Sequence, residues 1–247
     1  MDEADVRLIV GEQGSGKTTT GVALPVDDYY ANVDAVISPN GERISAATLT
    51  SEEQEELEAG GVIYDPFHHV KIFNDDNSES KIIKLPDDFM IASSVKIFSN
   101  FTFYGVRYVP ADLIRILEYV NSDFMTNAWI IMDESIMTDK RETMTVVGKL
   151  MSWFGAQARR RNLHMVVISQ YLNMIQSRFN LFAKTRVLCT YDKETRMVNL
   201  EVNNKSPVMQ STSYYAPNYW AFFKHDEIVR IPQGKIDKAI ATLQDAG

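Results

Sequence analysis

The chain has 247 residues, of which 45% are hydrophobic, and its formal net charge at pH 7 is −8. This hydrophobic fraction supports a substantial core and argues against a globally disordered chain. Cys189 is the single cysteine, so no intramolecular disulfide can form and a reducing compartment is favoured. No apolar run reaches the roughly 18 residues of a membrane span. The acidic N-terminus is unlike a signal peptide, so we expect neither feature.

Charge is distributed unevenly along the chain. Residues 1–80 contain 17 acidic and 4 basic residues, a balance of −13, whereas residues 157–196 contain 8 basic and 2 acidic residues, a balance of +6. The negative total argues against a protein coated for nucleic-acid binding. The asymmetry is compatible with a positive face or pore beside a negative exterior, and equally with ordinary surface variation.

The first predicted element is a buried strand at residues 6–10, which leads into a glycine-rich loop and then a helix. The loop, Gly11–Thr18, reads Gly-Glu-Gln-Gly-Ser-Gly-Lys-Thr and matches the phosphate-loop pattern. Its glycines allow successive N–H groups to turn inward, and the helix N-terminus adds partial positive charge where a phosphate would lie. The loop therefore predicts a nucleotide-binding site.

ATP and Mg²⁺ are the expected cofactors of this site. Lys17 is predicted to reach the β- and γ-phosphates, and the Thr18 hydroxyl to ligate Mg²⁺. The predicted nucleotide-binding residues are Gly11, Gly14, Ser15, Gly16, Lys17, Thr18 and Thr19.

The segment after the loop contains a proline, a short strand and an acidic helix. Pro25 is predicted to end or kink the first helix, and residues 34–38 to form a second strand. The acidic helix begins with a predicted capping box at Ser51 and Gln54. We interpret residues 41–90 as an elaboration on the core.

The second half of the chain alternates between apolar runs and helical patterns. Residues 128–133 and 164–170 have the apolar character of central parallel strands. Between them, residues 143–161 predict an amphipathic helix whose apolar stripe packs on the sheet; the stripe comprises Val147, Leu150, Met151, Phe154 and Ala158. Residues 186–191 and 196–202 predict further strands, and residues 235–243 a terminal helix.

Two acids close the strand at residues 128–133. Asp133 can hold the Mg²⁺ shell through water, and Glu134 can polarise the water that attacks the γ-phosphate. A small-molecule kinase needs no base for water, so the pair favours hydrolysis. The alternative is a strand that merely ends in acids at the surface.

Polar residues also mark both ends of the next strand. Gln170 follows its carboxyl end, where it could sense the γ-phosphate or place a water molecule. Arg159, Arg160 and Arg161 precede it, and an arginine there could stabilise transition-state charge in a neighbouring subunit. The alternatives are a polar residue that opens a loop and a solvated basic helix end.

The run from residue 158 to residue 170 resembles the corresponding stretch of the FtsK/HerA superfamily of DNA-translocating ATPases. Matched position by position, the trans-acting arginine of that family falls on Arg159 and its sensor glutamine on Gln170. Asn162 stands where glycine is usual and Ser169 where threonine is usual. Because three arginines are adjacent, the resemblance does not choose between Arg159 and Arg160.

Further segments carry the same resemblance. The phosphate loop and the Asp133–Glu134 pair match, and residues 180–188 are similar to the next loop and strand of the family. Residues 95–100 and 137–141 resemble segments of compact viral members, which include packaging and filamentous-phage assembly ATPases. The insertion and the tail of the chain are not covered.

The resemblance implies a RecA-like (ASCE) P-loop α/β fold with a central, mostly parallel sheet flanked by helices. Residues 1–247 are expected to form a single ATPase domain, with 41–90 as an insertion and 203–247 as a C-terminal extension. The family also implies a homo-oligomeric ring, expected to be a hexamer, that hydrolyses ATP between subunits and moves double-stranded DNA.

The expected function is therefore an ATPase that packages viral double-stranded DNA. Its implied partners are DNA and a capsid vertex or membrane-associated capsid protein, and its implied location is the host cytoplasm or the virion. One alternative is filamentous-phage assembly or conjugative transfer of single-stranded DNA. Others are a small P-loop kinase and a nucleotide-gated interaction module that moves no DNA.

Overall fold

The structure is a computed structural model that describes residues 5–74, 80–119, 122–133, 141–170, 182–204 and 208–224. The chain divides into two compact units. The first comprises Met1–Ala23, Ile97–Tyr104 and Tyr108–Gly247, and the second comprises Leu24–Lys96 and Gly105–Arg107.

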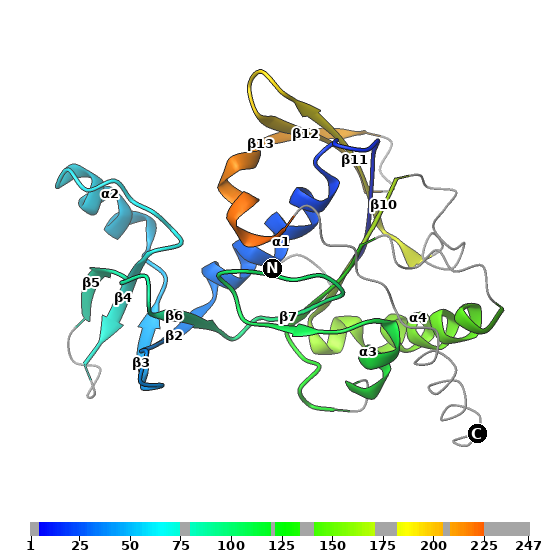
Figure 1. Ribbon diagram of the computed structural model, residues 1–247, viewed down its shortest axis with the longest axis horizontal. Coiled ribbons are helices and arrows are strands. Elements are labelled where there is room, and N and C mark those ends of the chain that lie inside the picture. Colours follow the sequence, from blue (N-terminus) through cyan, green and yellow to red (C-terminus); the bar gives the residue numbers. More distant parts are fainter. Residues whose placement is uncertain are drawn as a thin grey trace. The chain divides into compact units, whose positions relative to one another are not determined.

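The first unit is built on an eight-stranded sheet with the order β13-β12-β11-β1-β10-β9-β7-β8 (Figure 1). Strand β1 pairs in parallel with β10 and β11, β10 with β9, and β7 with β8, whereas β12 and β13 are antiparallel additions. The strands are β1 (Val6–Val10), β7 (Lys96–Ser99), β8 (Tyr108–Pro110), β9 (Ala128–Asp133), β10 (Leu163–Ser169), β11 (Thr185–Asp192), β12 (Met197–Asn203) and β13 (Gln210–Tyr215).

Apolar side chains on both faces explain why β9 and β10 are central strands. All seven residues of β10 and the first five of β9 are buried, as expected for parallel strands covered on both sides. Helix α4 (Arg141–Arg161) covers one face. Four residues of its predicted stripe, Leu150, Met151, Phe154 and Ala158, lie in the core cluster, which confirms the predicted packing for those four.

The strand order confirms the predicted RecA-like P-loop fold. Strand β1 leads into the phosphate loop, β9 ends in Asp133, and the single strand β10 lies between them. Helix α1 (Lys17–Ala31) follows the loop. Among its described residues, this unit also contains the short helix α3 (Leu113–Tyr119) and the 3-10 helix η2 (Ala216–Phe222).

The sequence predicts that Pro25 ends or kinks the first helix. The first alternative is wrong, because α1 continues to Ala31 with Pro25 inside it, and the kink stays a prediction. Tertiary contacts hold the turns beyond the proline. The hydroxyl of Tyr29 donates a hydrogen bond to the carbonyl of Ile91 at 2.8 Å, and that of Tyr30 donates to the carbonyl of Gly105 at 2.9 Å. Such contacts outweigh the loss of one intrahelical hydrogen bond.

The second unit contains a five-stranded antiparallel sheet with the order β5-β4-β3-β2-β6. Its strands are β2 (Val33–Ile37), β3 (Arg43–Ala47), β4 (His69–Phe73), β5 (Ser80–Lys84) and β6 (Met90–Ser93). The expected insertion at 41–90 lies within this unit. The division of residues 1–247 into one domain with an insertion and a C-terminal extension stays a prediction.

The capping box of helix α2 (Ser51–Ala59) lies one residue earlier in the chain than the sequence predicts. Its N-cap is Thr50, whose hydroxyl accepts a hydrogen bond from the backbone N–H of Glu53 at 3.3 Å. The Glu53 carboxylate accepts one from the Thr50 N–H at 2.8 Å. Thr50 and Glu53 form the capping box, and the prediction of Ser51 and Gln54 is wrong.

Two other expectations concern the C-terminal part and membrane association. The predicted helix at 235–243 lies outside the described residues. Residues 214–223 contain six aromatic side chains, of which Phe222 and Phe223 are buried, whereas Tyr215 and Trp220 are exposed. Within the described ranges, no helix combines the length and apolar character required to cross a membrane.

Candidate nucleotide-binding site

The phosphate loop fits closely between the strands beside it. Gly16 has a φ of 86°, in the left-handed region that favours glycine. A Cβ atom on Gly16 would lie 2.6 Å from Cγ2 of Val198, and one on Gly11 would lie 2.6 Å from the carbonyl oxygen of Cys189. Side chains at these positions would therefore collide with β12 and β11.

Polar groups of the loop are shielded from solvent. The Lys17 ammonium donates a hydrogen bond across the loop to the carbonyl of Glu12 at 2.7 Å. Ser15 and Thr19 are buried, and the Ser15 hydroxyl has no hydrogen-bond partner among the described residues. A buried ammonium and an unsatisfied hydroxyl in one loop at a helix N-terminus fit a bound phosphate group.

Thr18 and Asp133 meet although 115 positions separate them in the sequence. The Thr18 hydroxyl donates a hydrogen bond to Oδ2 of Asp133 at 2.9 Å. A hydroxyl and a carboxylate are ligands that Mg²⁺ accepts, together with water and phosphate oxygens. No group of three or more acidic, histidine or cysteine side chains capable of holding a metal occurs in the described ranges. Two such ligands fit a Mg²⁺ ion whose other ligands are water and nucleotide phosphate oxygens.

Gln170 belongs to the same edge of the sheet. It follows Ser169, the partner of Val10 in the register of β10 with β1, and Ile168 is the partner of Asp133 in the register with β9. Because these strands are parallel, Gln170 comes immediately after the level at which β1 enters the loop. The structure brings together the ends of three strands that the sequence predicts to bear the site.

Arg159 and Arg160 lie at the opposite edge. They are exposed in the last turn of α4, just before β10 begins, and β10 spans about 20 Å at the usual rise of a strand. Arg161 has a local role, because it donates a hydrogen bond to the carbonyl of Ser122 at 2.9 Å and its guanidinium lies 5.9 Å from the ring centre of Trp153. Neither Arg159 nor Arg160 can reach the loop of its own chain.

Glu134, the predicted base, lies outside the described residues. Its neighbour Asp133 is held by Asn100, a residue to which the sequence assigns no role. The Asn100 side chain hydrogen-bonds both the N–H and the carbonyl of Asp133, each at 2.9 Å. The available signal was the polar residue that ends the segment 95–100, but the role of Asn100 depends on which strand is the neighbour of β9.

The C-terminal strands also contact the loop helix. The buried Thr20 hydroxyl lies 2.9 Å from the carbonyl of Gly16, 2.9 Å from the hydroxyl of Tyr214 and 3.4 Å from Sγ of Cys189. Burial raises the pKa of Cys189 to about 11, although the Thr20 hydrogen bond and the Lys17 charge oppose the shift. Nothing in the sequence pairs Tyr214 with Thr20, because the contact depends on the β11–β13 meander.

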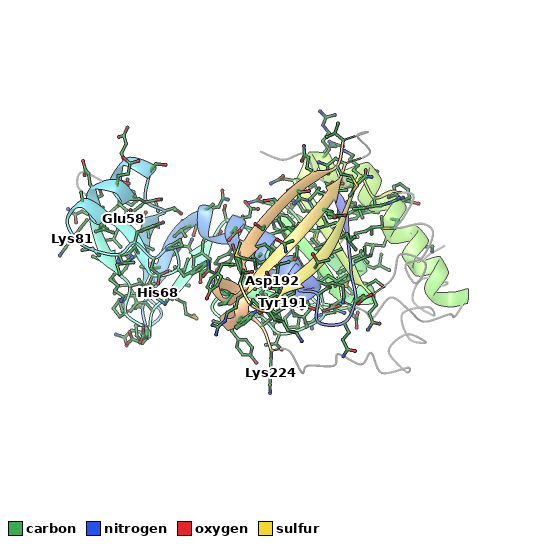
Figure 2. All side chains as sticks on the ribbon, turned by 90° about the horizontal axis from the view of Figure 1, so that it is seen from above. Glu58, His68, Lys81, Tyr191, Asp192 and Lys224 are labelled. Carbon is green, nitrogen blue, oxygen red and sulfur yellow. The ribbon has the colours of Figure 1, made fainter. Side chains whose placement is uncertain are left out.

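Strand β11 extends past the start of the loop. Leu188 is the partner of Val10, and four more residues follow before β11 ends at Asp192; Figure 2 labels Tyr191 and Asp192 at this end. Asp192 closes the turn to β12, and hydrogen bonds from the Thr195 hydroxyl and the Glu194 N–H lower its pKa.

Comparison with known proteins yields structural likeness only. No protein-family model and no curated protein matches the chain. Similar solved structures include the N-terminal domain of zonular occludens toxin from Neisseria meningitidis, with 14% identity, 90% of this chain and 100% of that chain covered, and a TM-score of 0.48. A KaiC-like protein from Pyrococcus horikoshii has 9% identity, coverage of 91% and 92%, and a TM-score of 0.45. The RadB recombinase has 10% identity, coverage of 85% and 86%, and a TM-score of 0.42.

The strand order and the phosphate loop between β1 and α1 define the fold of this chain. The chain has a RecA-like P-loop fold, in which a phosphate loop and a magnesium-type Thr–Asp pair share one sheet edge. Nucleotide binding with Mg²⁺, and hydrolysis in general, are the chemistry that such a site performs.

Proposed function

We propose that this protein is an ATP-hydrolysing motor that translocates DNA and packages viral double-stranded DNA into a capsid. The hydrogen bond between Thr18 and Asp133 is the observation that carries the ATPase part. It joins the end of the loop to the end of β9, as a site for Mg²⁺ and a triphosphate requires.

Each predicted residue has a proposed task in hydrolysis. Loop N–H groups and Lys17 hold the phosphates, while Thr18 and Asp133 hold Mg²⁺, which neutralises charge on the phosphate oxygens when bound. Gln170 detects the γ-phosphate or positions water. Glu134 accepts a proton from the attacking water, a role that is proposed from the sequence.

The ring is supported by the position of the arginines. Arg159 and Arg160 lie about 20 Å from their own phosphate loop, by the strand rise along β10. If Arg159 or Arg160 stabilises the transition state, it therefore acts on the site of a neighbouring subunit. We propose a closed homo-oligomer, with the hexamer expected from the FtsK/HerA resemblance.

Double-stranded DNA as the substrate rests on that resemblance and on charge. Several basic residues between 157 and 196 are exposed, namely Arg159, Arg160, Lys184, Arg186, Lys193 and Arg196. Contacts from such residues to phosphates would be non-specific and sensitive to salt. The proposed partner is a capsid vertex or a membrane-associated capsid protein, in the host cytoplasm or on the virion.

The test measures ATP turnover with and without double-stranded DNA, together with the mass of the assembly in nucleotide. We expect DNA to stimulate turnover and the mass to match a ring. Lys17→Ala should abolish nucleotide binding, because it removes the ammonium that faces the phosphates. Lys81→Ala, an exposed lysine on β5 (Figure 2), is the control that should leave binding unchanged.

Other results would replace the proposal. Unchanged ATP affinity of Lys17→Ala by calorimetry would refute the site assignment. Stimulation by single-stranded DNA alone would favour phage assembly or conjugative transfer, and phosphorylation of a metabolite by a monomer would favour a kinase.

A further inference from the structure

A single side chain fixes the main chain of Asp133 on its β7 side. Asn100 follows β7, the neighbour of β9 in the sheet, and it is 5% exposed. Its amide Nδ2 donates to the carbonyl of Asp133, and its Oδ1 accepts from the N–H of Asp133, both at 2.9 Å. One carboxamide thus binds both backbone polar groups of the residue that ends β9.

This contact replaces strand pairing where the ladder stops. The backbone N–H of Asn100 still donates to the carbonyl of Ile131, at 3.4 Å. Asp133 lies two residues after Ile131 on β9, and its backbone groups are hydrogen-bonded by the side chain of Asn100. Partly buried backbone groups that lose their hydrogen-bond partners destabilise a fold, so Asn100 holds Asp133 against rotation about its own backbone.

We propose that Asn100 is a positioning residue for magnesium, acting through Asp133 without touching the nucleotide. The orientation of Asp133 directs its Oδ2 to within 2.9 Å of the Thr18 hydroxyl. Partners that orient a metal ligand typically change metal affinity by about 10- to 100-fold when removed. The inference rests on the proposed nucleotide site and adds to it the residue that sets its metal affinity.

The test measures the affinity of a fluorescent ADP analogue for the full chain, in Mg²⁺ and in a chelator. Wild-type protein should bind more tightly in Mg²⁺. Asn100→Ala should lose about tenfold or more of that Mg²⁺-dependent gain, and its half-saturating Mg²⁺ concentration should rise. Affinity in the chelator should stay within about twofold, because the loop and Lys17 are untouched.

A second variant and a control separate positioning from folding. Asn100→Ser keeps a neutral polar group but cannot make both hydrogen bonds to Asp133, so it should show the same selective loss of Mg²⁺-dependent affinity. It takes the place of Asn100→Ala in the test if the alanine variant does not fold. Asn32→Ala removes another asparagine amide that donates to a main-chain carbonyl, that of Asp28 at 2.8 Å. Because Asn32 lies in the second unit, Asn32→Ala should leave the Mg²⁺-dependent gain in affinity for the ADP analogue unchanged.

Each outcome decides one question. A wild-type protein that fails to bind the analogue overturns the proposed function. A wild-type protein that binds with a Mg²⁺-dependent gain, alongside Asn100 variants that keep this gain, overturns only the positioning role. Equal weakening in Mg²⁺ and in chelator likewise overturns it, since a purely structural residue would behave that way.

Discussion

Gly16 is a residue at which the site depends on the absence of a side chain. Its φ of 86° is disfavoured for other residues, and an added Cβ would also meet Val198 at 2.6 Å. Gly14 has a similar φ of 77°, but an added Cβ there meets nothing within 4 Å. The two positions therefore separate backbone strain from steric overlap.

We expect Gly16→Ala to lower both stability and nucleotide affinity more than Gly14→Ala. Left-handed backbone should cost either variant about 1–2 kcal/mol, and overlap with Val198 should add to the cost only at Gly16. Denaturant unfolding and calorimetric ADP binding measure the two effects. Equal losses in the two variants would show that Val198 yields easily and that strain alone decides.

Cys189 gives the site a pH signature. Its pKa in the folded protein, about 11, lies above the ordinary value of 9.0 because the thiol is buried. The unfolded chain therefore releases this proton first as pH rises. The stability that Cys189 contributes is complete below pH 9 and is lost as pH rises through 11.

Comparison with Cys189→Ala isolates this effect, since the tyrosines titrate in both proteins. The stability difference between wild type and variant should shift by roughly 1–2 kcal/mol against the wild type between pH 8.5 and 10.5. Urea unfolding at fixed pH values measures it. A difference independent of pH would mean that the folded thiol titrates normally.

At the scale of elements, the sequence predicts best the strands that are buried on both faces. Strands β9 and β10 are identified almost to the residue, because their apolar runs leave no other buried arrangement. The proline in α1 misleads, because the contacts of Tyr29 and Tyr30 that sustain the helix come from remote segments. Strand β3 has a mixed burial pattern and no clear alternation to reveal it.

Some residues of the candidate site can also be predicted from the sequence, and others cannot. Thr18 and Asp133 are predictable because each belongs to a local motif with known chemistry, and the parallel sheet brings the motifs together. Asn100 and Tyr214 are not, because their roles arise from which strands are neighbours. Local patterns do not encode strand order.

The cap of α2 offers a test with its own control. Thr50→Ala removes the hydroxyl that accepts from Glu53, whereas Ser51→Ala changes a neighbouring residue inside the helix. We expect Thr50→Ala to destabilise the second unit by about 1 kcal/mol and Ser51→Ala by much less. Thermal unfolding measures both, and the reverse order would restore Ser51 as the cap.

At the scale of the whole molecule, the sheet separates two parts of the proposed chemistry. The loop, Asp133 and Gln170 occupy the carboxyl edge of the parallel strands, and Arg159 and Arg160 the other edge. A complete site would combine the carboxyl edge of the sheet in one chain with the arginine-bearing edge of the sheet in a second chain. This arrangement is what a trans-acting arginine requires.

Mixed subunits test that arrangement. Arg159→Ala and Glu134→Gln should each be inactive alone, but a random mixture should restore about a quarter of the interfaces, where intact Glu134 meets intact Arg159 in a head-to-tail ring. ATP turnover of mixtures verified by mass measures the recovery. Arg160→Ala is tested in parallel to choose between the two arginines.

Absence of recovery in verified mixtures, for both arginines, would contradict action in trans. Arg161→Ala is the structural comparison, because Arg161 is already engaged with Ser122 and Trp153. Arg161→Ala should lower the stability of the protein. If it also lowers ATP turnover, mixing with Glu134→Gln subunits should not restore the turnover.

In the proposed ring, the placement of arginine and phosphate loop at opposite ends of β10 would also affect how the assembly grows. An open row of subunits would leave one loop without its arginine and one arginine without a loop, so a row of n subunits would hold n − 1 working sites. Closure alone completes the last one. Turnover per subunit would then rise with each addition and reach its maximum on closure, making hydrolysis a gauge of assembly and leaving solitary subunits nearly idle.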